Sequence, residues 1–600
     1  MEQTINDVFK NRAIKYKKRI AIEKKFKGKW ESATWEEYYN QSRHTGLSLY
    51  SLGINKGDKV SILAENRLEW LFSDMGTLGA GGCIIPIYPT LTKEDVAYIV
   101  ENSESKIIIV ENSNQLIKAL YALNHCKCLD KIIVMNAEDI KEDHTSIMSF
   151  KNLLDAGKKL HESNQELFEN LSKAVTPDDI ATIVYTSGTT GTPKGAMITH
   201  KNIMAVIKSL AQIKPPYAYD SDQTVPFLPL SHVFERVAGH FFGMYIGITS
   251  SYAESIETLL ADLKEKKPTI VLAVPRVLEK VYQKIMSQVD NQPLWKRIIF
   301  SLGQNLGNKI SEYRESKQSI PVVFKLLHAA AYILIFKKLQ EGLGGRVRWI
   351  TASGAPTAND IIRFFNAAGI MVIEGYGMTE CVAPATMSRI DHYKIGTAGP
   401  PIPGMEMKIA EDGEILIRGE NLFKGYFKME EETKRAFTED GFFMTGDVGK
   451  FDKDRFLAIT DRKKDLIITS GGKNVAPQKI ENLFKTNPIF SQFIVIGDKK
   501  KYLSAICNIN LEEAAKLAIK NNIAFESPLD LLNNEKFNKA LEKIISEMNT
   551  KLAKYETIKR FKIINQEFSQ DTGELTPSLK VKRKVVHTKY RDIIDSMYEN

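Results

Sequence analysis

The sequence is poor in cysteine, with five among 600 residues. These are Cys83, Cys126, Cys128, Cys381 and Cys507. So few thiols at irregular spacing exclude a disulfide framework, and we expect a reducing compartment, the cytoplasm. The tetrapeptide His125-Cys126-Lys127-Cys128 lacks a second ligand pair at zinc spacing. We therefore interpret it as two ordinary thiols rather than a metal site.

Long apolar runs are also missing. The longest, VVFKLLHAAAYILIF at 322–336, contains Lys325 and His328. It is too short to span a bilayer comfortably, because a spanning helix needs about 20 predominantly apolar residues. The start, MEQTINDVFKNRAIKYKKRI, has no apolar segment followed by small residues. We therefore expect neither a secretory signal nor a membrane-spanning helix.

A strong excess of one charge is absent as well. The chain has 82 basic and 73 acidic residues, a net charge of +9. This mild excess fits an anionic small substrate or contact with an anionic membrane. The sequence carries no nucleic-acid-binding signature, so we expect no such partner. With 43% hydrophobic and 26% charged residues the composition is globular, and 600 residues predict more than one packed unit.

Buried strands alternate with helices in the first part of the chain. Residues 57–66, 106–113 and 180–186 have strand patterns, whereas 68–82 and 200–213 have helical spacing. This alternation favours an α/β fold with parallel sheets.

Further strands and one helix are expected in the middle of the chain. Residues 346–354 and 371–377 have strand patterns, and they flank a helix at 357–369 that Thr357 would cap and Gly369 would end.

The predicted secondary-structure pattern then changes twice. From about residue 405 short strands and turns dominate, and after 475 the pattern is helix, hairpin and helix. We place a domain boundary at Asp461, in the polar stretch TDRKKD, which separates 1–460 from 461–600.

Residues 285–345 are rich in helical pattern, basic side chains and aromatic rings. An extra helical hairpin packed on the core is the favoured interpretation. The alternative is an interfacial membrane contact, in which lysines flank an apolar stripe.

The stretch YTSGTTGTPKG at 185–195 is the most informative in the chain. Glycines bring backbone N–H groups close to a ligand, hydroxyls add donors, and Lys194 adds a charge. These groups suit a polyphosphate, and a strand before the loop with a helix after it strengthens that interpretation. The pattern is not a Walker A loop, because proline occupies position 193 and Gly195 follows the lysine.

This loop resembles the phosphate loop of the AMP-forming acyl-adenylate superfamily, which includes acyl-CoA synthetases, luciferases and peptide-synthetase adenylation domains. Six further motifs follow in the family's order over almost the whole chain. They are LPLSHVFER (228–236), TASGAP (351–356), GYGMTE (375–380), MTGD (444–447), DRKKDLIITSGGKNVAP (461–477) and LTPSLKVKR (575–583). LPLSHVFER and the helical segment before TASGAP are similar to the long-chain fatty acyl-CoA synthetase branch.

The resemblance implies an α/β fold with a large N-terminal domain of stacked α/β subdomains and a β-rich subdomain, plus a small mobile α+β C-terminal domain. It also implies that ATP converts a long-chain fatty acid to acyl-AMP with release of pyrophosphate, and that CoA then displaces AMP to give acyl-CoA. Mg²⁺ is the implied cofactor. An alternative is a ligase that activates another acid or passes the acyl group to a carrier protein. Cytoplasmic action, with peripheral contact on the inner face of a membrane, is a further expectation. Oligomeric state stays open.

The resemblance also assigns nucleotide-binding roles. The phosphates would be held by Thr186, Ser187, Gly188, Thr189, Thr190, Gly191 and Lys194. Thr186 and Glu380 would bind Mg²⁺. The adenine end would be lined by Gly354, Ala355, Pro356, Gly375, Tyr376, Gly377 and Thr379, with Tyr376 stacked on the base. Asp447 would accept hydrogen bonds from the ribose hydroxyls, and Arg462 would contact the ribose or phosphate.

The remaining roles concern the acid, CoA and domain motion. Lys580, selected by the register of T-x-S-x-K-x-x-R, would reach the acyl carboxylate and the α-phosphate. Asp461 would be the hinge, and His232 and Phe234 would lie at the acyl carboxylate and the tunnel mouth. Some relatives have a tryptophan gate where this chain has Phe234. CoA would meet the turn Gly471, Gly472 and Lys473.

Overall fold

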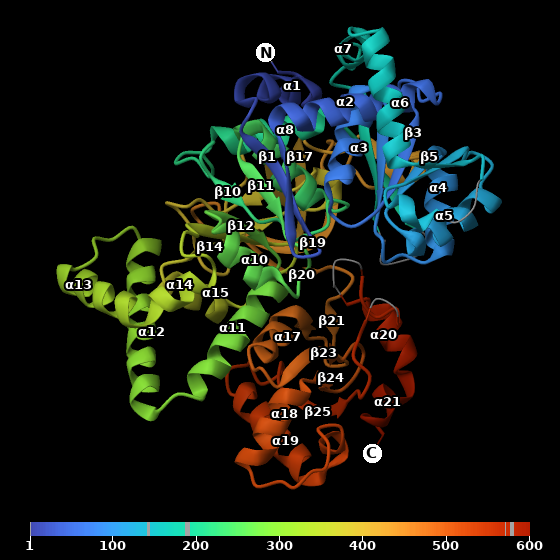
Figure 1. Cartoon of the computed structure of the whole chain (residues 1–600). Coiled ribbons are helices and arrows are strands. Elements are labelled where there is room, and N and C mark those ends of the chain that lie inside the picture. The colour runs from blue at the N-terminus through green and yellow to red at the C-terminus, as the bar shows by residue number, and fades with distance from the viewer. Residues whose placement is uncertain (1, 141–143, 187–192, 570–571, 577–580, 600) are drawn as a thin grey trace.

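The computed structural model describes residues 2–140, 144–186, 193–569, 572–576 and 581–599. A large part formed by the first three quarters of the chain lies above a smaller C-terminal part, drawn orange to red (Figure 1). Buried apolar clusters of the large part draw on residues 5–457, and those of the C-terminal part on residues 467–597.

One eight-stranded sheet carries the predicted phosphate loop. Its order is β18-β9-β8-β4-β3-β5-β6-β7. The strands are β3 (Lys59–Leu63), β4 (Cys83–Ile87), β5 (Ser105–Val110), β6 (Lys131–Val134), β7 (Ile147–Ser149), β8 (Ile180–Thr186), β9 (Lys194–Thr199) and β18 (Gly425–Tyr426). The six strands β8, β4, β3, β5, β6 and β7 run parallel, as the alternating pattern predicts. Strand β9 pairs antiparallel with β8 on one side and with β18 on the other.

Helices pack around this sheet (Figure 1). They are α1 (Ile5–Tyr16), α2 (Trp35–Ser51), α3 (Leu68–Gly79), α4 (Lys93–Ser103), α5 (Ser113–His125), η1 (Ala137–Asp139), α6 (Phe150–Ser163), α7 (Leu167–Lys173) and α8 (His200–Gln212). The predicted helices over 68–82 and 200–213 are confirmed as α3 and α8.

The expected strand–loop–helix order around the phosphate loop is wrong. The chain returns from the loop as strand β9, which pairs antiparallel with β8, and α8 begins only at His200. The segment Lys194–Thr199 has buried Ala196, Ile198 and Thr199 and lies between β8 and the edge strand β18. The loop therefore closes a β-hairpin and has no helix N-terminus directly behind it.

The second sheet also has eight strands, in the order β15-β14-β13-β12-β10-β11-β1-β2. They are β1 (Ile20–Phe26), β2 (Lys29–Thr34), β10 (Gln223–Thr224), β11 (Thr249–Tyr252), β12 (Ile270–Ala273), β13 (Trp349–Ser353), β14 (Met371–Tyr376) and β15 (Thr386–Met387). The neighbouring helices are η2 (Phe234–Phe241), α9 (Phe242–Ile246), α10 (Leu259–Lys266), α15 (Asn359–Ala367) and η4 (Thr379–Cys381). The strands from β14 to β1 are parallel.

The predicted cap of α15 is wrong. The helix begins at Asn359 with Ala358 as its N-cap, and no side chain caps it. The backbone N–H of Thr357 instead donates to the Glu374 carboxylate at 3.3 Å, which holds Thr357 outside the helix. Gly369, at a φ of +80°, follows the helix end as expected.

The β-rich sheet is antiparallel, in the order β16-β17-β19-β20. Its strands are β16 (Met405–Ile409), β17 (Glu414–Gly419), β19 (Phe443–Phe451) and β20 (Leu457–Arg462), with α16 (Glu430–Arg435) beside it.

The C-terminal part is α+β. Its strands are β21 (Ile467–Ile468), β22 (Asn474–Val475), β23 (Phe490–Ile496), β24 (Leu503–Ile509) and β25 (Ile558–Ile563). Its helices are α17 (Pro477–Lys485), α18 (Leu511–Lys520), η5 (Asp530–Asn533), α19 (Glu535–Asn549), α20 (Arg583–Lys589) and α21 (Arg591–Ser596).

A group of helices projects to the left in Figure 1. They are α11 (Pro275–Asp290), α12 (Leu294–Glu315), α13 (Val322–Ala331), η3 (Tyr332–Phe336) and α14 (Lys337–Gly342). Helix α12 packs along α15, whose C-terminal turn also contacts α13. In the described portion of the chain, every helix falls short of the length and apolarity that a membrane crossing needs.

Candidate functional site

The base of the phosphate loop is a register pair. Thr186, at the end of β8, lies opposite Lys194, at the start of β9, and its hydroxyl donates to the Lys194 carbonyl at 3.4 Å. The Lys194 ammonium forms an ion pair with Glu432 at 2.7 Å and lies 5.2 Å from the Tyr426 ring centre. The predicted contacts of Ser187, Gly188, Thr189, Thr190 and Gly191 lie outside the described residues.

Glu380 lies beside the same hairpin. Tyr426, whose strand pairs with β9, donates its hydroxyl to Glu380 at 2.9 Å. Glu380 is 7% exposed, and burial raises the pKa of its carboxyl, although the Tyr426 hydrogen bond and the charge of Arg462 oppose this. A divalent cation would stabilise the charged carboxylate, so these oxygen donors fit Mg²⁺. The sequence analysis did not predict a role for Tyr426, because the residue lies outside all of the family motifs.

Three further predicted residues meet close to Glu380, on which the charges of Arg462 and Asp447 act. The Tyr376 hydroxyl donates to Asp447 at 2.7 Å, and the Arg462 guanidinium lies 3.2 Å from the other Asp447 oxygen. Asp447 and Arg462 are cross-strand partners on β19 and β20. Because Tyr376 and Asp447 are buried at 7% and 6% exposure, this carboxylate is held in one orientation.

The loop of Gly354, Ala355 and Pro356 follows β13, next to the end of β14, where Ser353 is paired with Gly375. Gly354 has a φ of +91°, which favours glycine. A Cβ at Gly377 would lie 3.0 Å from the backbone of Ala383, so a side chain at this position would be tightly packed.

Packing against Ala383 therefore favours a small residue at Gly377, in addition to the nucleotide contact that the resemblance implies for the GYG motif. Thr379 begins η4, directly before Glu380.

His232 and Phe234 lie at the start of the π-helical turn η2. The Phe234 N–H donates to His232 Nδ1 at 3.1 Å, so the neutral ring carries its proton on Nε2. Phe234 is 6% exposed and belongs to the same apolar cluster as Phe227. The next residue, Glu235, is fully buried, which raises its pKa to about 8 and keeps it neutral at pH 7.

An apolar cavity of about 240 Å³ lies beneath the ends of β12 and β13. Ala273 and Ile350, on these adjacent strands, line it, and Val274, which follows Ala273, approaches Gly354. Its wall includes Phe227, Leu259, Leu260, Leu263, Val271, Val277, Leu278, Val281, Leu343, Val347 and Phe365. Ile256, Glu257, Lys280 and Lys284 lie at its exposed rim. No sequence pattern predicts this cavity, because its lining comes from β12, β13, α10, α11, α15 and the loops between them.

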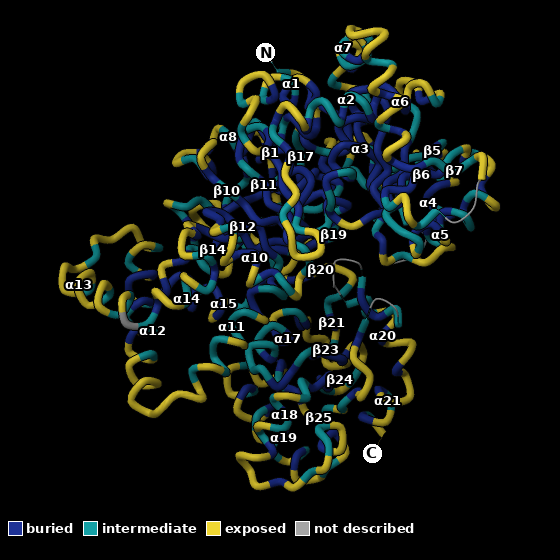
Figure 2. Tube along the Cα trace, viewed as in Figure 1, coloured by how far each residue is buried: buried dark blue, intermediate teal, exposed yellow. Residues whose placement is uncertain are grey.

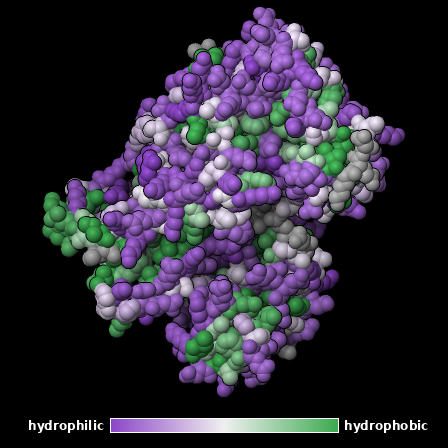
Figure 3. Space-filling view, viewed as in Figure 1, coloured by the Kyte–Doolittle hydropathy of each residue, from purple (hydrophilic) through white to green (hydrophobic). Residues whose placement is uncertain are grey.

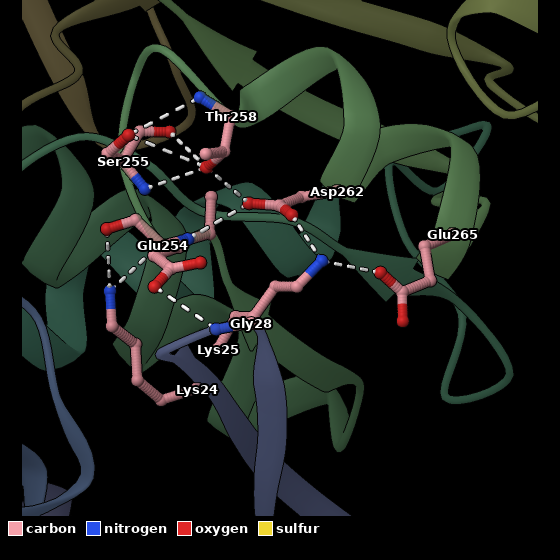
Figure 4. Close-up of polar contacts among 9 residues, drawn as sticks. Lys24, Lys25, Gly28, Glu254, Ser255, Thr258, Asp262 and Glu265 are labelled. Carbon is pink, nitrogen blue, oxygen red and sulfur yellow. Dashed lines mark hydrogen bonds and ion pairs between the residues drawn. The ribbon is translucent and has the colours of Figure 1, made fainter.

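A polar network joins the β1–β2 hairpin to helix α10 and to the loop before it (Figure 4). Asp262, which is fully buried on α10, pairs with Lys25 at 3.0 Å, and Lys25 also pairs with Glu265 at 2.6 Å. The other Asp262 oxygen accepts hydrogen bonds from the Glu254 N–H and the Thr258 hydroxyl, both at 3.0 Å. The β1–β2 hairpin is thereby fastened to the segment that contributes Ile256 and Leu259 to the cavity.

Asp461 lies within β20 and is 1% exposed, although its neighbours in the sequence suggested a polar linker. One carboxylate oxygen accepts from the Arg462 N–H at 2.8 Å, and the other from the Gln478 N–H at 3.1 Å. The Asp461 side chain thus links the last strand of the β-rich sheet to the first turn of α17. Burial raises its pKa to about 6.

Two family models match most of this chain. Residues 9–427 match the model described as AMP-binding enzyme, and residues 464–600 match the AMP-binding enzyme C-terminal domain. The chain belongs to the AMP-binding enzyme family. The family's named members include a long-chain-fatty-acid–CoA ligase, FadD15, of Mycobacterium bovis, which is 34% identical over 95% of this chain and 93% of its own length. Another is the long-chain-fatty-acid–CoA ligase ACSBG2 of Xenopus laevis, 32% identical over 100% of this chain and 84% of its own.

Solved structures share the AMP-binding enzyme fold. The adenylation domain of a carboxylate reductase from Mycobacterium chelonae superposes with a TM-score of 0.75 at 21% identity, covering 100% of this chain and 91% of that one. An anthranilate CoA ligase in complex with anthranoyl-AMP gives a TM-score of 0.73 at 17% identity, covering 99% of both chains. The predicted α/β fold with a small C-terminal α+β part is confirmed.

The C-terminal domain of this AMP-binding enzyme touches the candidate nucleotide loop. The Asn482 side chain on α17 donates to the Pro356 carbonyl at 3.1 Å, and the Gln283 side chain on α11 donates to the Lys485 carbonyl at 3.2 Å. Sequence reasoning missed these contacts because they join distant elements. The turn of Gly471, Gly472 and Lys473 lies at the exposed tip of β21–β22, and its hydrogen bonds to described residues run within the turn, from the Lys473 N–H to the Thr469 hydroxyl at 3.2 Å.

Lys580 lies outside the described residues, but the segments on both sides of it are fixed. Leu575 and Val581 form a β-bridge, and the Lys582 N–H donates to the Glu574 carbonyl at 2.7 Å. The Arg583 guanidinium pairs with the buried Glu481 of α17 at 2.6 Å. The described residues on both sides of Lys580 are therefore anchored to the C-terminal domain.

Proposed function

We propose that this AMP-binding enzyme is a long-chain-fatty-acid–CoA ligase that forms acyl-AMP from a fatty acid and ATP, releases pyrophosphate, and transfers the acyl group to CoA. The names of its relatives support this activity. The observation that carries the proposal is the apolar cavity. Of its lining strands, β13 leads directly to the candidate nucleotide loop at Gly354, and β12 ends beside that loop at Val274.

The cavity suits an alkyl chain. Its lining is aliphatic or aromatic apart from the charged residues at the rim, and burying methylene groups there contributes about 0.8 kcal/mol for each. Phe234, packed in the same apolar cluster as the cavity wall, and His232 beside it would flank the carboxylate end. Phenylalanine would then stand at the mouth of the acyl site, where some relatives have a tryptophan gate.

The first step brings two anions together, so neutralisation of charge dominates it. Thr186, Lys194 and the loop between them would hold the β- and γ-phosphates, and Lys580 would lie between the carboxylate and the α-phosphate. Mg²⁺, held by Thr186 and Glu380, would supply positive charge to the phosphate oxygens. Asp447 would bind the ribose hydroxyls while Tyr376 stacks on adenine.

The second step needs space for the CoA thiol. Lys580 and a pantetheine arm cannot occupy the same space, so we propose that the C-terminal domain rotates at Asp461 between the two steps. Gly471, Gly472 and Lys473 would then form the CoA contact. Their position at an exposed turn leaves them accessible to such a ligand.

Acids from butyrate to eicosanoate, assayed for AMP formation with and without CoA, test the proposal. We expect long chains to be preferred and AMP turnover to depend on CoA. Pyrophosphate release that is independent of CoA would favour the alternative, a ligase that delivers acyl-AMP to a carrier protein. No pyrophosphate with any acid would refute adenylation altogether. We propose that the enzyme acts in the cytoplasm, with access to the inner face of a membrane.

A further inference from the structure

Helices α12 and α13 expose an unusual number of large apolar side chains. Trp295 is 60% exposed, Leu302 63% and Leu326 67%. The full set, called here the apolar face, is Leu294, Trp295, Ile298, Ile299, Leu302, Val322, Val323, Leu326, Leu327 and Ile333. In Figure 3 the surface over the region of α12 and α13, at the left, is largely green, and Figure 2 shows long exposed stretches, drawn yellow, along both helices. A patch of this kind on a water-exposed surface indicates an interaction site.

The fold holds this face outward. On the opposite side of α12, a Cβ at Gly307 would lie 2.7 Å from the Ala367 carbonyl, so the helix backbone packs directly on α15. The His328 ring of α13 is within hydrogen-bonding distance of the same carbonyl, at 2.9 Å. Because these contacts fix the rotation of both helices, Trp295, Leu302 and Leu326 cannot turn inward without breaking them.

Basic side chains surround the apolar face. Residues 294–342 contain eight lysines and arginines but three glutamates. The Lys296 ammonium lies 5.4 Å from the Trp295 ring centre, and that of Lys309 lies 5.8 Å from the Phe324 ring centre. Long basic side chains can lie along apolar surface and keep their charges at its edge.

We propose that the apolar face binds the surface of an anionic lipid bilayer, with α12 and α13 lying in the interface. Exposed leucines, valines and tryptophan would enter the headgroup–acyl boundary, and the lysines would pair with lipid phosphates. The charge balance favours this partner over a second copy of the chain, because two such basic faces would repel each other. Helix α11 lines the cavity and leads into α12. If the cavity binds the acyl chain, as the proposed function has it, binding of the apolar face to a bilayer would bring the acyl site close to membrane-dissolved substrate.

Co-sedimentation of the full chain with vesicles tests the proposal without any turnover. We expect binding to vesicles of equal parts phosphatidylglycerol and phosphatidylcholine, much weaker binding to phosphatidylcholine alone, and weakening by salt. The double variant Leu302→Ser, Leu326→Ser should reduce binding by about tenfold or more. The matched control is Ile117→Ser, Ile519→Ser, whose side chains are 63% and 68% exposed on α5 and α18 and should leave binding unchanged.

Trp295 reports on the same surface directly. Vesicles should shift its fluorescence to the blue, and the shift should disappear in Trp295→Phe, because Trp35, Trp70 and Trp349 are buried and the half-buried Trp30 lies on β2 against Lys266, away from the apolar face. Absence of vesicle binding by the wild-type chain, or equal loss in both double variants, would overturn the proposal. Self-association that the Leu302→Ser, Leu326→Ser variant abolishes, without vesicle binding, would assign the face to a second copy instead. None of these outcomes depends on whether the chain activates fatty acids.

Discussion

The Tyr376 hydroxyl donates a hydrogen bond to the Asp447 carboxylate at 2.7 Å, which joins the end of β14 to the middle of β19. The GYG and TGD motifs are 71 residues apart at these positions, yet they share one buried contact. If Tyr376 stacks on adenine and Asp447 binds the ribose, this hydrogen bond orients both halves of the nucleoside together.

Replacing Tyr376 with phenylalanine should weaken ATP binding while keeping the ring. A hydrogen bond to a charged group contributes about 1.5–3 kcal/mol, so we expect the KM for ATP to rise about tenfold or more. Pyrophosphate release at varied ATP concentration measures this. Tyr217→Phe is the matched control, because Tyr217 is equally buried and its hydroxyl donates to the Ser388 carbonyl. The same KM in both variants would show that the Tyr376 hydroxyl does not act on the nucleotide.

Lys580 should be needed for the first half-reaction alone. Lys580→Ala should reduce acyl-AMP formation by orders of magnitude, because a charge near the α-phosphate is lost, yet spare thioester formation from supplied acyl-AMP. Lys584→Ala in the same basic run is the control and should retain both steps. Equal loss of both half-reactions in Lys580→Ala would remove the assignment.

Strand patterns and motifs in the sequence predict many of the strands, helices and site residues. They do not predict which residues pair across neighbouring strands. Asp447 and Arg462 were each assigned to the nucleotide, whereas their ion pair depends on the register of β19 with β20. Strand β9 was missed because the glycine-rich loop suggested a helix after it. Helix α15 lacks its predicted cap because the Thr357 N–H donates to Glu374, a tertiary contact with no local signal.

Asp461 connects strand β20 to helix α17, so a proline there should impair one half-reaction selectively. Proline fixes φ near −65° and removes the N–H, which would hold the C-terminal domain in one orientation. Separate assays of acyl-AMP formation and thioester formation measure the effect. Asp461→Asn keeps an oxygen acceptor for the Gln478 N–H and should retain both steps. Normal rates of both steps in Asp461→Pro would exclude a hinge at this position.

Glu574 should make the anchoring of the Lys580 segment sensitive to acid. Burial raises the pKa of its carboxyl, but hydrogen bonds from Lys589, Thr572 and Tyr590 outweigh this and lower the pKa to about 2. A depressed carboxyl pKa stabilises the folded state above the unfolded value of about 4.3, and this contribution is lost as pH falls towards 2. The melting temperature of Glu574→Gln should therefore be lower than wild type at pH 7.

The difference between Glu574→Gln and wild type should narrow as the pH decreases from about 5 towards 3, because the wild-type carboxylate progressively loses its advantage. Glu567→Gln, on the same segment, serves as the control and should follow wild type throughout. A pH-independent difference in melting temperature would show that Glu574 acts through packing rather than charge.

Asp262 should set both the stability of the large domain and the shape of the acyl cavity. Its carboxylate is fully buried, and Asp262→Ala would leave the Lys25 ammonium with the Glu265 partner alone. Loss of one partner of a buried pair costs about 3 kcal/mol of unfolding free energy, and the Glu254 N–H and Thr258 hydroxyl would also lose their acceptor. The segment that carries Ile256 and Leu259 should then loosen, so the variant should discriminate less between long and medium chains. Denaturant unfolding and the acid panel measure the two effects.

Glu265→Ala is the control: it removes the half-exposed partner of the same lysine and should cost less than about 1 kcal/mol of unfolding free energy, with chain-length preference unchanged. If the two variants behave alike, the buried carboxylate does not brace the cavity wall.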